Sequence, residues 1–118
     1  MSVWDDRMPI YLQLRHRIVE QILKGVFAEG EAIPSVRQVA SDEKINPITI
    51  SKAYQMLVEE NLVEKRRGLG MYVRAGGRAL ALSQERTHFL KEEWPKIRGR
   101  LASLEIDLET LPGLEKTS

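Results

Sequence analysis

The feature that most limits the fold is a pair of helix-start signals between residues 34 and 60. Ser35 is a favoured N-cap, and Gln38 three positions later completes the pattern of a capping box. Asn46 and Pro47 give a second start, since asparagine is a favoured N-cap and proline a favoured first helical residue. Apolar residues at three- and four-residue spacing follow each start. We therefore predict a short helix after Ser35 and a longer one from about Pro47 to Glu60.

Another amphipathic helix precedes these two. Apolar residues recur every four positions after Pro9, and Gly25 supplies a stop. These apolar residues are Ile10, Leu14, Ile18 and Ile22. Residues 1–8 have no such pattern, and we expect them to form a mobile arm.

Residues 62–74 have the pattern of a β-hairpin. Two short strands, 62–65 and 71–74, flank a turn at 66–70 that contains Gly68 and Gly70. Asn61 is expected to end the preceding helix in the left-handed conformation. The pair Gly76-Gly77 then breaks the chain, so we predict two domains, residues 1–75 and 76–118.

Residues 76–118 are predicted to be a short helical segment with a disordered end after Pro112-Gly113. Apolar residues favour one helix to about Trp94, and Pro95 is expected to kink it or to start a new one. These helices are too few to bury their own apolar faces. We therefore predict that they pair with a second copy of the chain in a homodimer.

The predicted fold class is mainly α with a small β component (α+β). It comprises an N-terminal winged helix-turn-helix, made of three helices and a hairpin wing, and a short C-terminal helical dimerisation segment. In this arrangement the second helix supports the third, and the third lies in the major groove of DNA. The element order therefore predicts a partner, double-stranded DNA.

Composition limits the other functions open to the chain. It has no cysteine, which excludes disulfides, thiol catalysis and cysteine-based zinc sites. His16 and His88 each lack a second ligand at metal-binding spacing, so we predict no metal and no cofactor. No nucleophile, base and orienting group can be assembled, so an enzyme is not expected. Without a signal peptide or an apolar run of about 20 residues, we expect no membrane association and a cytoplasmic location.

Candidate DNA contacts follow from the same element order. The net charge is only +1, so a DNA-facing patch must be local, and Lys65-Arg66-Arg67 is the obvious basic run. Short side chains after Asn46 let the helix start approach bases and phosphates closely, and the positive end of the helix dipole favours a phosphate there. Arg37 can reach the DNA backbone. Arg66, Arg67 and Gly68 form a tip suited to a minor groove or the flanking phosphates.

Four blocks of the sequence, in this order and at this spacing, resemble the GntR family of bacterial transcription regulators. They are IPSVRQVA (33–40), NPITISKAYQ (46–55), LVEENLV (57–63) and RGLGMYV (67–73). The Asn-Pro start, the Ala-Tyr-Gln that follows and the short tail are similar to the YtrA-type subfamily. The chain departs from the family at Asn61, where glycine is usual, and at Met71-Tyr72, where Thr-Phe is common. The resemblance implies a compact homodimeric repressor, often associated with operons for membrane transporters.

The resemblance also implies which residues touch DNA. Carried over position by position, the family's contacts fall on Ser35, Arg37, Asn46, Pro47, Ile48, Thr49, Ser51, Arg67 and Gly68. Several groups of the family have at position 47 an arginine that reads bases. Proline cannot do this, so base reading is expected to shift to Asn46, Ile48 or Lys52.

The sequence thus predicts a sequence-specific transcription regulator, a homodimeric repressor that binds a pseudo-palindromic operator. The alternative is a winged-helix module that binds another protein and not DNA. A protein-binding wing has no need of two arginines beside a glycine, so the hairpin tip distinguishes the two. The sequence leaves open the operator sequence, the direction of control and a small-molecule effector, whose site would lie between the C-terminal helices or at the dimer interface.

Overall fold

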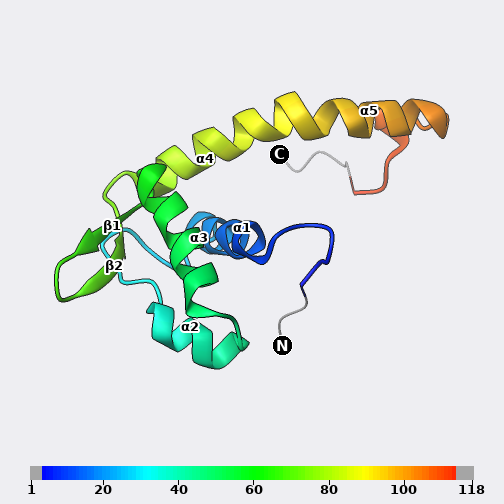
Figure 1. The fold of residues 1–118 in the computed structure, drawn as a ribbon. Coiled ribbons are helices and arrows are strands. Elements are labelled where there is room, and N and C mark those ends of the chain that lie inside the picture. The colour runs from blue at the N-terminus through cyan, green and yellow to red at the C-terminus, as the bar shows by residue number, and fades with distance from the viewer. Residues whose placement is uncertain (1–3, 114–118) are drawn as a thin grey trace. The chain divides into compact units, whose positions relative to one another are not determined.

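The computed structural model describes residues 4–113 of the chain. They form two compact units, of which the first ends at Leu82 and the second begins at Ser83. The first unit contains three helices, a two-stranded hairpin and the start of a fourth helix (Figure 1). The predicted domains, 1–75 and 76–118, stay a prediction, and the disordered end predicted after Gly113 falls on residues 114–118, outside the described residues.

Helix α1 (Ile10–Leu23) buries the apolar stripe that the spacing predicts, on one side of the core. Gly25, at φ +81°, follows its end. Residues 4–8 are held against the helix, contrary to the prediction of a mobile arm, whose residues 1–3 lie outside the described residues. The Gln13 side-chain amide donates hydrogen bonds to the carbonyl oxygens of Asp5 and Met8 at 2.6 Å, and Trp4 lies over the Arg17 guanidinium at 3.7 Å.

Helices α2 (Val36–Glu43) and α3 (Pro47–Glu59) begin at the two predicted caps. Ser35 Oγ accepts the backbone N–H of Gln38 at 3.1 Å. The second half of the predicted capping box does not form, because the Gln38 amide donates to Asp42 one turn further along. Between the helices, Lys44 takes a left-handed φ of +57°.

The end of α3 confirms the predicted left-handed cap. Asn61 has a φ of +64°, and the backbone N–H of Leu62 donates to the carbonyl oxygen of Leu57 at 3.0 Å. This is a Schellman ending, and it satisfies carbonyl groups that the helix leaves open. It also turns the chain directly into the first strand of the hairpin.

A single apolar core joins α1, α3 and the hairpin. Tyr54, Ile22, Ile50, Leu57, Leu62, Val19, Val63 and Val73 are its largest fully buried side chains. At the edge of the core, the Arg15 guanidinium forms a bidentate ion pair with the Glu60 carboxylate, which links α1 to the end of α3. This ion pair helps to fix α3, whose other face is exposed to solvent.

The hairpin consists of the antiparallel strands β1 (Val63–Arg66) and β2 (Gly70–Val73). Its register pairs Val63 with Val73 and Arg66 with Gly70. The segment before α2 runs along β2, where Ala32 bridges to Tyr72, so the hairpin is tied to the α1–α2 connection. Three helices followed by this hairpin form the predicted winged helix-turn-helix.

Helix α4 (Gly77–His88) starts inside the first unit, at the glycine pair that the sequence suggested as a break. Gly77 and Ala81 are buried, and the Arg78 guanidinium donates to the carbonyl oxygen of Leu23 at 3.0 Å. A Cβ on Gly77 would lie 2.8 Å from the carbonyl oxygen of Leu62. The close approach explains why glycine stands at this position.

The second unit comprises the rest of α4, a π-helical segment η1 (Phe89–Glu93), α5 (Trp94–Ser103) and a short 3-10 helix η2 (Leu108–Thr110). In η1 the backbone N–H of Trp94 donates to the carbonyl oxygen of Phe89. Pro95 lies in the first turn of α5. His88, Glu93 and Trp94 all have right-handed helical dihedrals, so the helix continues through η1 into α5, and the fresh start that was one of two outcomes predicted for Pro95 is not observed.

Candidate nucleic-acid interface

The N-terminal turn of α3 presents its backbone and several side chains to solvent. Asn46 caps the helix, its Oδ1 accepting the backbone N–H of Ile48 at 2.9 Å, and Pro47 takes the first helical position. Asn46, Pro47, Ile48 and Ser51 are exposed, and Thr49 is half-buried. The exposed turn carries the positive end of the helix dipole, which favours an anion there.

The opposite face of α3 holds this turn in place. Ile50, Ala53, Tyr54 and Leu57 are buried, at the three- and four-residue spacing of a helix face. The exposed side chains are therefore presented by a helix that cannot rotate without removing these residues from the core.

A groove of about 360 Å³ separates the start of α2 and α3 from the hairpin. Its polar lining comes from Ser35, Ser51, Gln55 and Lys65. Ser35 and Ser51 lie sixteen positions apart in the sequence, yet the fold brings them to one groove with a lysine from β1. Two hydroxyls and an ammonium can all donate hydrogen bonds to a phosphate.

The wing tip is smaller than the sequence predicted. Arg66 is the last residue of β1, paired with Gly70, so the prediction that it forms part of the tip is wrong. Its guanidinium donates to Glu64 at 3.2 Å and lies 4.2 Å from the centre of the Tyr72 ring. The turn itself comprises residues 67–69, with Gly68 at a φ of +76° that few other residues adopt.

The cations of this face fall into two groups. The side chains of Arg37, Lys65 and Arg67 are exposed, and no side-chain hydrogen bond, ion pair or ring contact within residues 4–113 holds them. Arg66 is engaged on the wing, and the Lys52 ammonium lies 4.0 Å from the centre of the Tyr11 ring of α1. The first group can bind an anion without breaking a contact within the protein.

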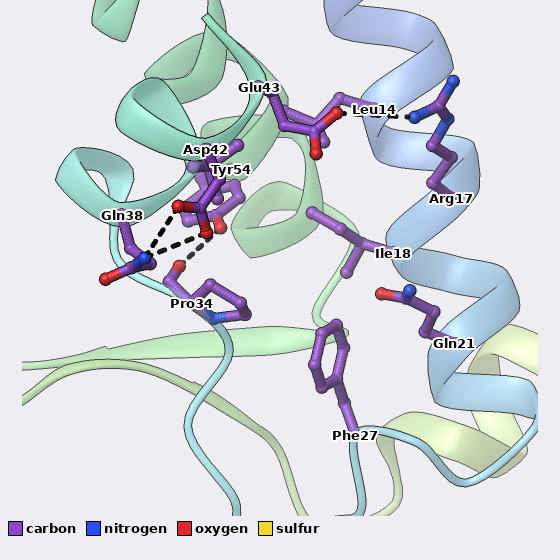
Figure 2. A pocket seen from close by; sticks show the side chains of 11 residues that line it. Leu14, Arg17, Ile18, Gln21, Phe27, Pro34, Gln38, Asp42, Glu43 and Tyr54 are labelled. Atoms are coloured by element: carbon purple, nitrogen blue, oxygen red, sulfur yellow. Dashed lines mark hydrogen bonds and ion pairs between the residues drawn. The ribbon is translucent and has the colours of Figure 1, made fainter. Parts of the chain in front are cut away.

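A second hollow, of about 300 Å³, lies between α1 and α2 (Figure 2). The Tyr54 hydroxyl donates to the carbonyl oxygen of Pro34 at 2.5 Å, and burial raises the pKa of this phenol to about 12. On the opposite wall, Arg17 faces the Glu43 carboxylate at 3.8 Å. These contacts join α3 to the start of α2, and α1 to its end, so they position α2 beside the exposed turn.

The structure leaves most of the predicted contact residues accessible and brings Ser35 and Ser51 to one groove. The exposed residues on α2, α3 and the wing are Ser35, Arg37, Asn46, Pro47, Ile48, Ser51, Arg67 and Gly68. Lys65 belongs to the predicted basic run but not to the contacts carried over from the family, and it lines the groove beside Ser35 and Ser51. The two-residue period of a strand is the signal that could have singled it out, since Lys65 points to the face opposite Glu64 and Arg66.

The fold and this surface define a winged helix-turn-helix protein of the DNA-binding class. Residues 10–73 match the family described as "Bacterial regulatory proteins, gntR family", and the chain belongs to this family. It is 36% identical over 85 residues to the HTH-type transcriptional repressor YtrA of Bacillus subtilis, which confirms the resemblance to YtrA-type regulators. That match covers 72% of this chain and 65% of YtrA, so the chain spans just under two-thirds of that relative's length.

Two solved structures extend the comparison. A GntR family transcriptional regulator from Listeria monocytogenes is 30% identical, with a TM-score of 0.73 over 90% of this chain and 91% of the other. The DNA-binding domain of AraR, solved in complex with operator ORR3, is 26% identical, with a TM-score of 0.55 over 62% of this chain and 89% of that domain. These relatives are named as regulators, not enzymes.

Residues 4–113 lack two further kinds of feature. No helix in residues 4–113 combines the length and the apolar character needed to cross a membrane. The same part of the chain contains no group of three or more histidine, aspartate or glutamate side chains arranged to hold a metal ion.

Proposed function

We propose that this chain is a sequence-specific DNA-binding transcription regulator, which acts as a homodimeric repressor on a pseudo-palindromic operator. The observation that carries the proposal is the exposed N-terminal turn of α3, held from behind by buried residues and flanked by unpaired cations. In a winged helix-turn-helix this turn enters the major groove, and the wing lies along the neighbouring backbone. The repressor and regulator names of the relatives support the same function.

The proposed contacts divide by chemistry. Arg37, Lys65 and Arg67 supply positive charge to phosphates, which positions the protein without reading sequence. Ile48 and Thr49 lie on the turn that meets the base edges, and these side chains supply specificity. Asn46 caps this turn, and its amide NH₂ group donates to a phosphate. Lys52 and Arg66 have contacts within the protein, so we assign them a smaller share of DNA binding.

The second unit supports the homodimer. Phe89, Leu90, Ile97, Leu104 and Leu108 are large apolar side chains that this unit leaves exposed. Pairing with a second copy would bury them, and two-fold symmetry predicts half-sites about one helical turn apart, or about 10 base pairs. Sedimentation velocity of the full chain should give twice the monomer mass; a monomer at concentrations that saturate DNA would contradict the dimer.

Binding to DNA is tested with the promoter of the operon that encodes the chain. In an electrophoretic shift assay, we expect the promoter duplex to bind about 1,000-fold or more tightly than a shuffled duplex of equal length. Thr49→Ala should lower this ratio more than it lowers binding to the shuffled duplex. Equal affinity for both duplexes would contradict a sequence-specific regulator, and no binding to either would favour a protein partner.

Three further points of the proposal follow the family. We propose that the chain acts in the cytoplasm, that its target is an operon for a membrane transporter, and that an effector, if it uses one, binds the second unit or the dimer interface. Two observations provide the tests: whether the chain copurifies with the target DNA from cells, and which genes lie beside its own.

A further inference from the structure

The two most exposed large apolar side chains among residues 4–113 both lie on the proposed DNA-facing surface. Ile48, on the first turn of α3, is 77% exposed, and Leu69, on the turn of the wing, is 67% exposed. Scattered apolar side chains are common on protein surfaces and need no explanation. Their concentration on the two elements that would enter the grooves of DNA indicates a role in binding.

Ile48 is held out from the protein rather than folded back onto it. Its backbone N–H donates to the Asn46 cap at 2.9 Å, and the proline before it restricts the backbone. A β-branched side chain in a helix has one strongly preferred χ1 angle, so its methyl groups keep a defined direction. The residues one turn further on the same face, Ser51 and Lys52, are polar. Ile48 is therefore a rigid apolar projection on a polar surface.

We infer that Ile48 makes α3 select thymine, by packing against the C5-methyl group of that base in the major groove; the inference rests on the proposed DNA-binding function. Thymine is the base that offers an apolar group in the major groove, whereas the other base edges present donors and acceptors. Isoleucine cannot hydrogen-bond, so placing it on those edges would remove water from polar groups without replacing it. Pro47 beside it cannot donate either, which leaves this part of the turn with apolar contact as its means of reading a base.

The expected loss of affinity follows from the free energy gained when one methyl group is buried. Removing one buried methyl group weakens binding about fourfold. A dimer that makes the contact in both half-sites should lose about 16-fold when both methyl groups are removed, since independent contributions multiply.

The test begins with selection of bound duplexes from a randomised pool by the full chain, by Ile48→Val and by Ile48→Ala. We expect the wild type and Ile48→Val to select thymine at one position in each half-site, and Ile48→Ala to lose that preference while still selecting the rest of the operator. Leu69→Ala is the matched control, because it removes another highly exposed apolar side chain, on the wing, and should keep the preference for thymine. Deoxyuracil at that position, which removes only the methyl group, should weaken wild-type binding about fourfold per half-site and leave Ile48→Ala unchanged.

The outcomes separate this inference from the proposed function. An operator selected equally well by the wild type and Ile48→Ala, thymine included, would overturn the role of Ile48 and leave sequence-specific DNA binding intact. Unchanged wild-type affinity for the uracil duplex would do the same. A wild-type chain that selects no sequence at all would overturn the proposed function, and the inference with it.

Discussion

Arg67→Ala tests whether the wing lies along the DNA backbone. Arg67 is on the turn of the wing, exposed, with no hydrogen bond or ion pair to another residue in the range 4–113. Its removal therefore breaks no contact in the folded chain, and we expect the melting temperature to stay unchanged. Any loss of DNA binding then reports a contact to DNA.

The size of the effect follows from counterion release. Each cation that neutralises a phosphate adds about −0.9 to the slope of log K against log salt concentration, so one Arg67 per subunit gives about −1.8 in a dimer. Between about 50 and about 200 mM salt, a contribution of that size changes affinity by a factor of about 12. The wild type should thus lose about 12-fold more affinity than Arg67→Ala over this range. The same change is expected on operator and shuffled DNA, because phosphates carry no sequence.

Fluorescence anisotropy on a labelled duplex, titrated at four or more salt concentrations, gives both slopes. Arg74→Ala is the matched control: it removes the same charge from the same unit, but Arg74 donates to Asn61 at 2.9 Å, away from the wing tip. Its slope should equal that of the wild type. If Arg67→Ala kept the wild-type slope, or if Arg74→Ala lowered the slope as much, the wing would not lie on phosphates.

Four other substitutions test the scaffold and the Asn46 cap. Gly77→Ala should destabilise the chain by about 1–3 kcal/mol, because the added Cβ meets the Leu62 carbonyl. Gly99→Ala has open space around it and should stabilise the chain by about 0.5–1 kcal/mol. Thermal unfolding measures both changes in stability, and equal shifts of the melting temperature would contradict the close approach at Gly77. The raised pKa of Tyr54, from 10.0 to about 12, means that ionisation favours unfolding, so stability present below pH 10 should fall as the pH rises toward 12, and Tyr54→Phe should flatten the decline in urea denaturation. A decline equally steep in Tyr54→Phe would assign it to other groups. Asn46→Asp should keep the melting temperature, since aspartate caps a helix as well as asparagine does. The same substitution should weaken binding to all duplexes at least about tenfold. If its affinity equalled that of the wild type, residue 46 would not lie beside a phosphate.

The elements were predictable because their signals are local. A cap, the helix it begins and the residue that ends it lie within one short stretch of sequence, as do Asn46, Pro47 and Asn61 around α3. Alternating and four-residue apolar spacing likewise identifies the buried face of an element without reference to the rest of the fold. The winged helix-turn-helix follows from the order of such elements.

The use of individual cations was not predictable in the same way. Whether Lys52 is free or lies over a ring depends on Tyr11, forty-one positions earlier in the sequence, and the pairing of Arg66 with Tyr72 depends on the hairpin register. The hairpin extends one pair further toward its tip than the spacing predicts, so Arg66 lies in β1 opposite Gly70 rather than in the turn. The π-helical segment before Pro95 has the same origin, because the sequence predicts an interruption but not the hydrogen bonds that replace the lost ones.

The two helix caps on the DNA-facing surface show how one side chain can serve both the fold and a ligand. A hydroxyl or a neutral amide carries an acceptor and a donor. Ser35 and Asn46 each use the acceptor on a backbone N–H of their own helix, which leaves the hydroxyl proton and the amide NH₂ group to donate outward. Phosphate oxygens only accept, so capping and phosphate binding use different atoms and do not compete. Alanine at either position removes the cap and the outward donor together. Aspartate at position 46 keeps the cap but replaces the outward donor with a negative charge, so it tests phosphate binding separately from helix capping.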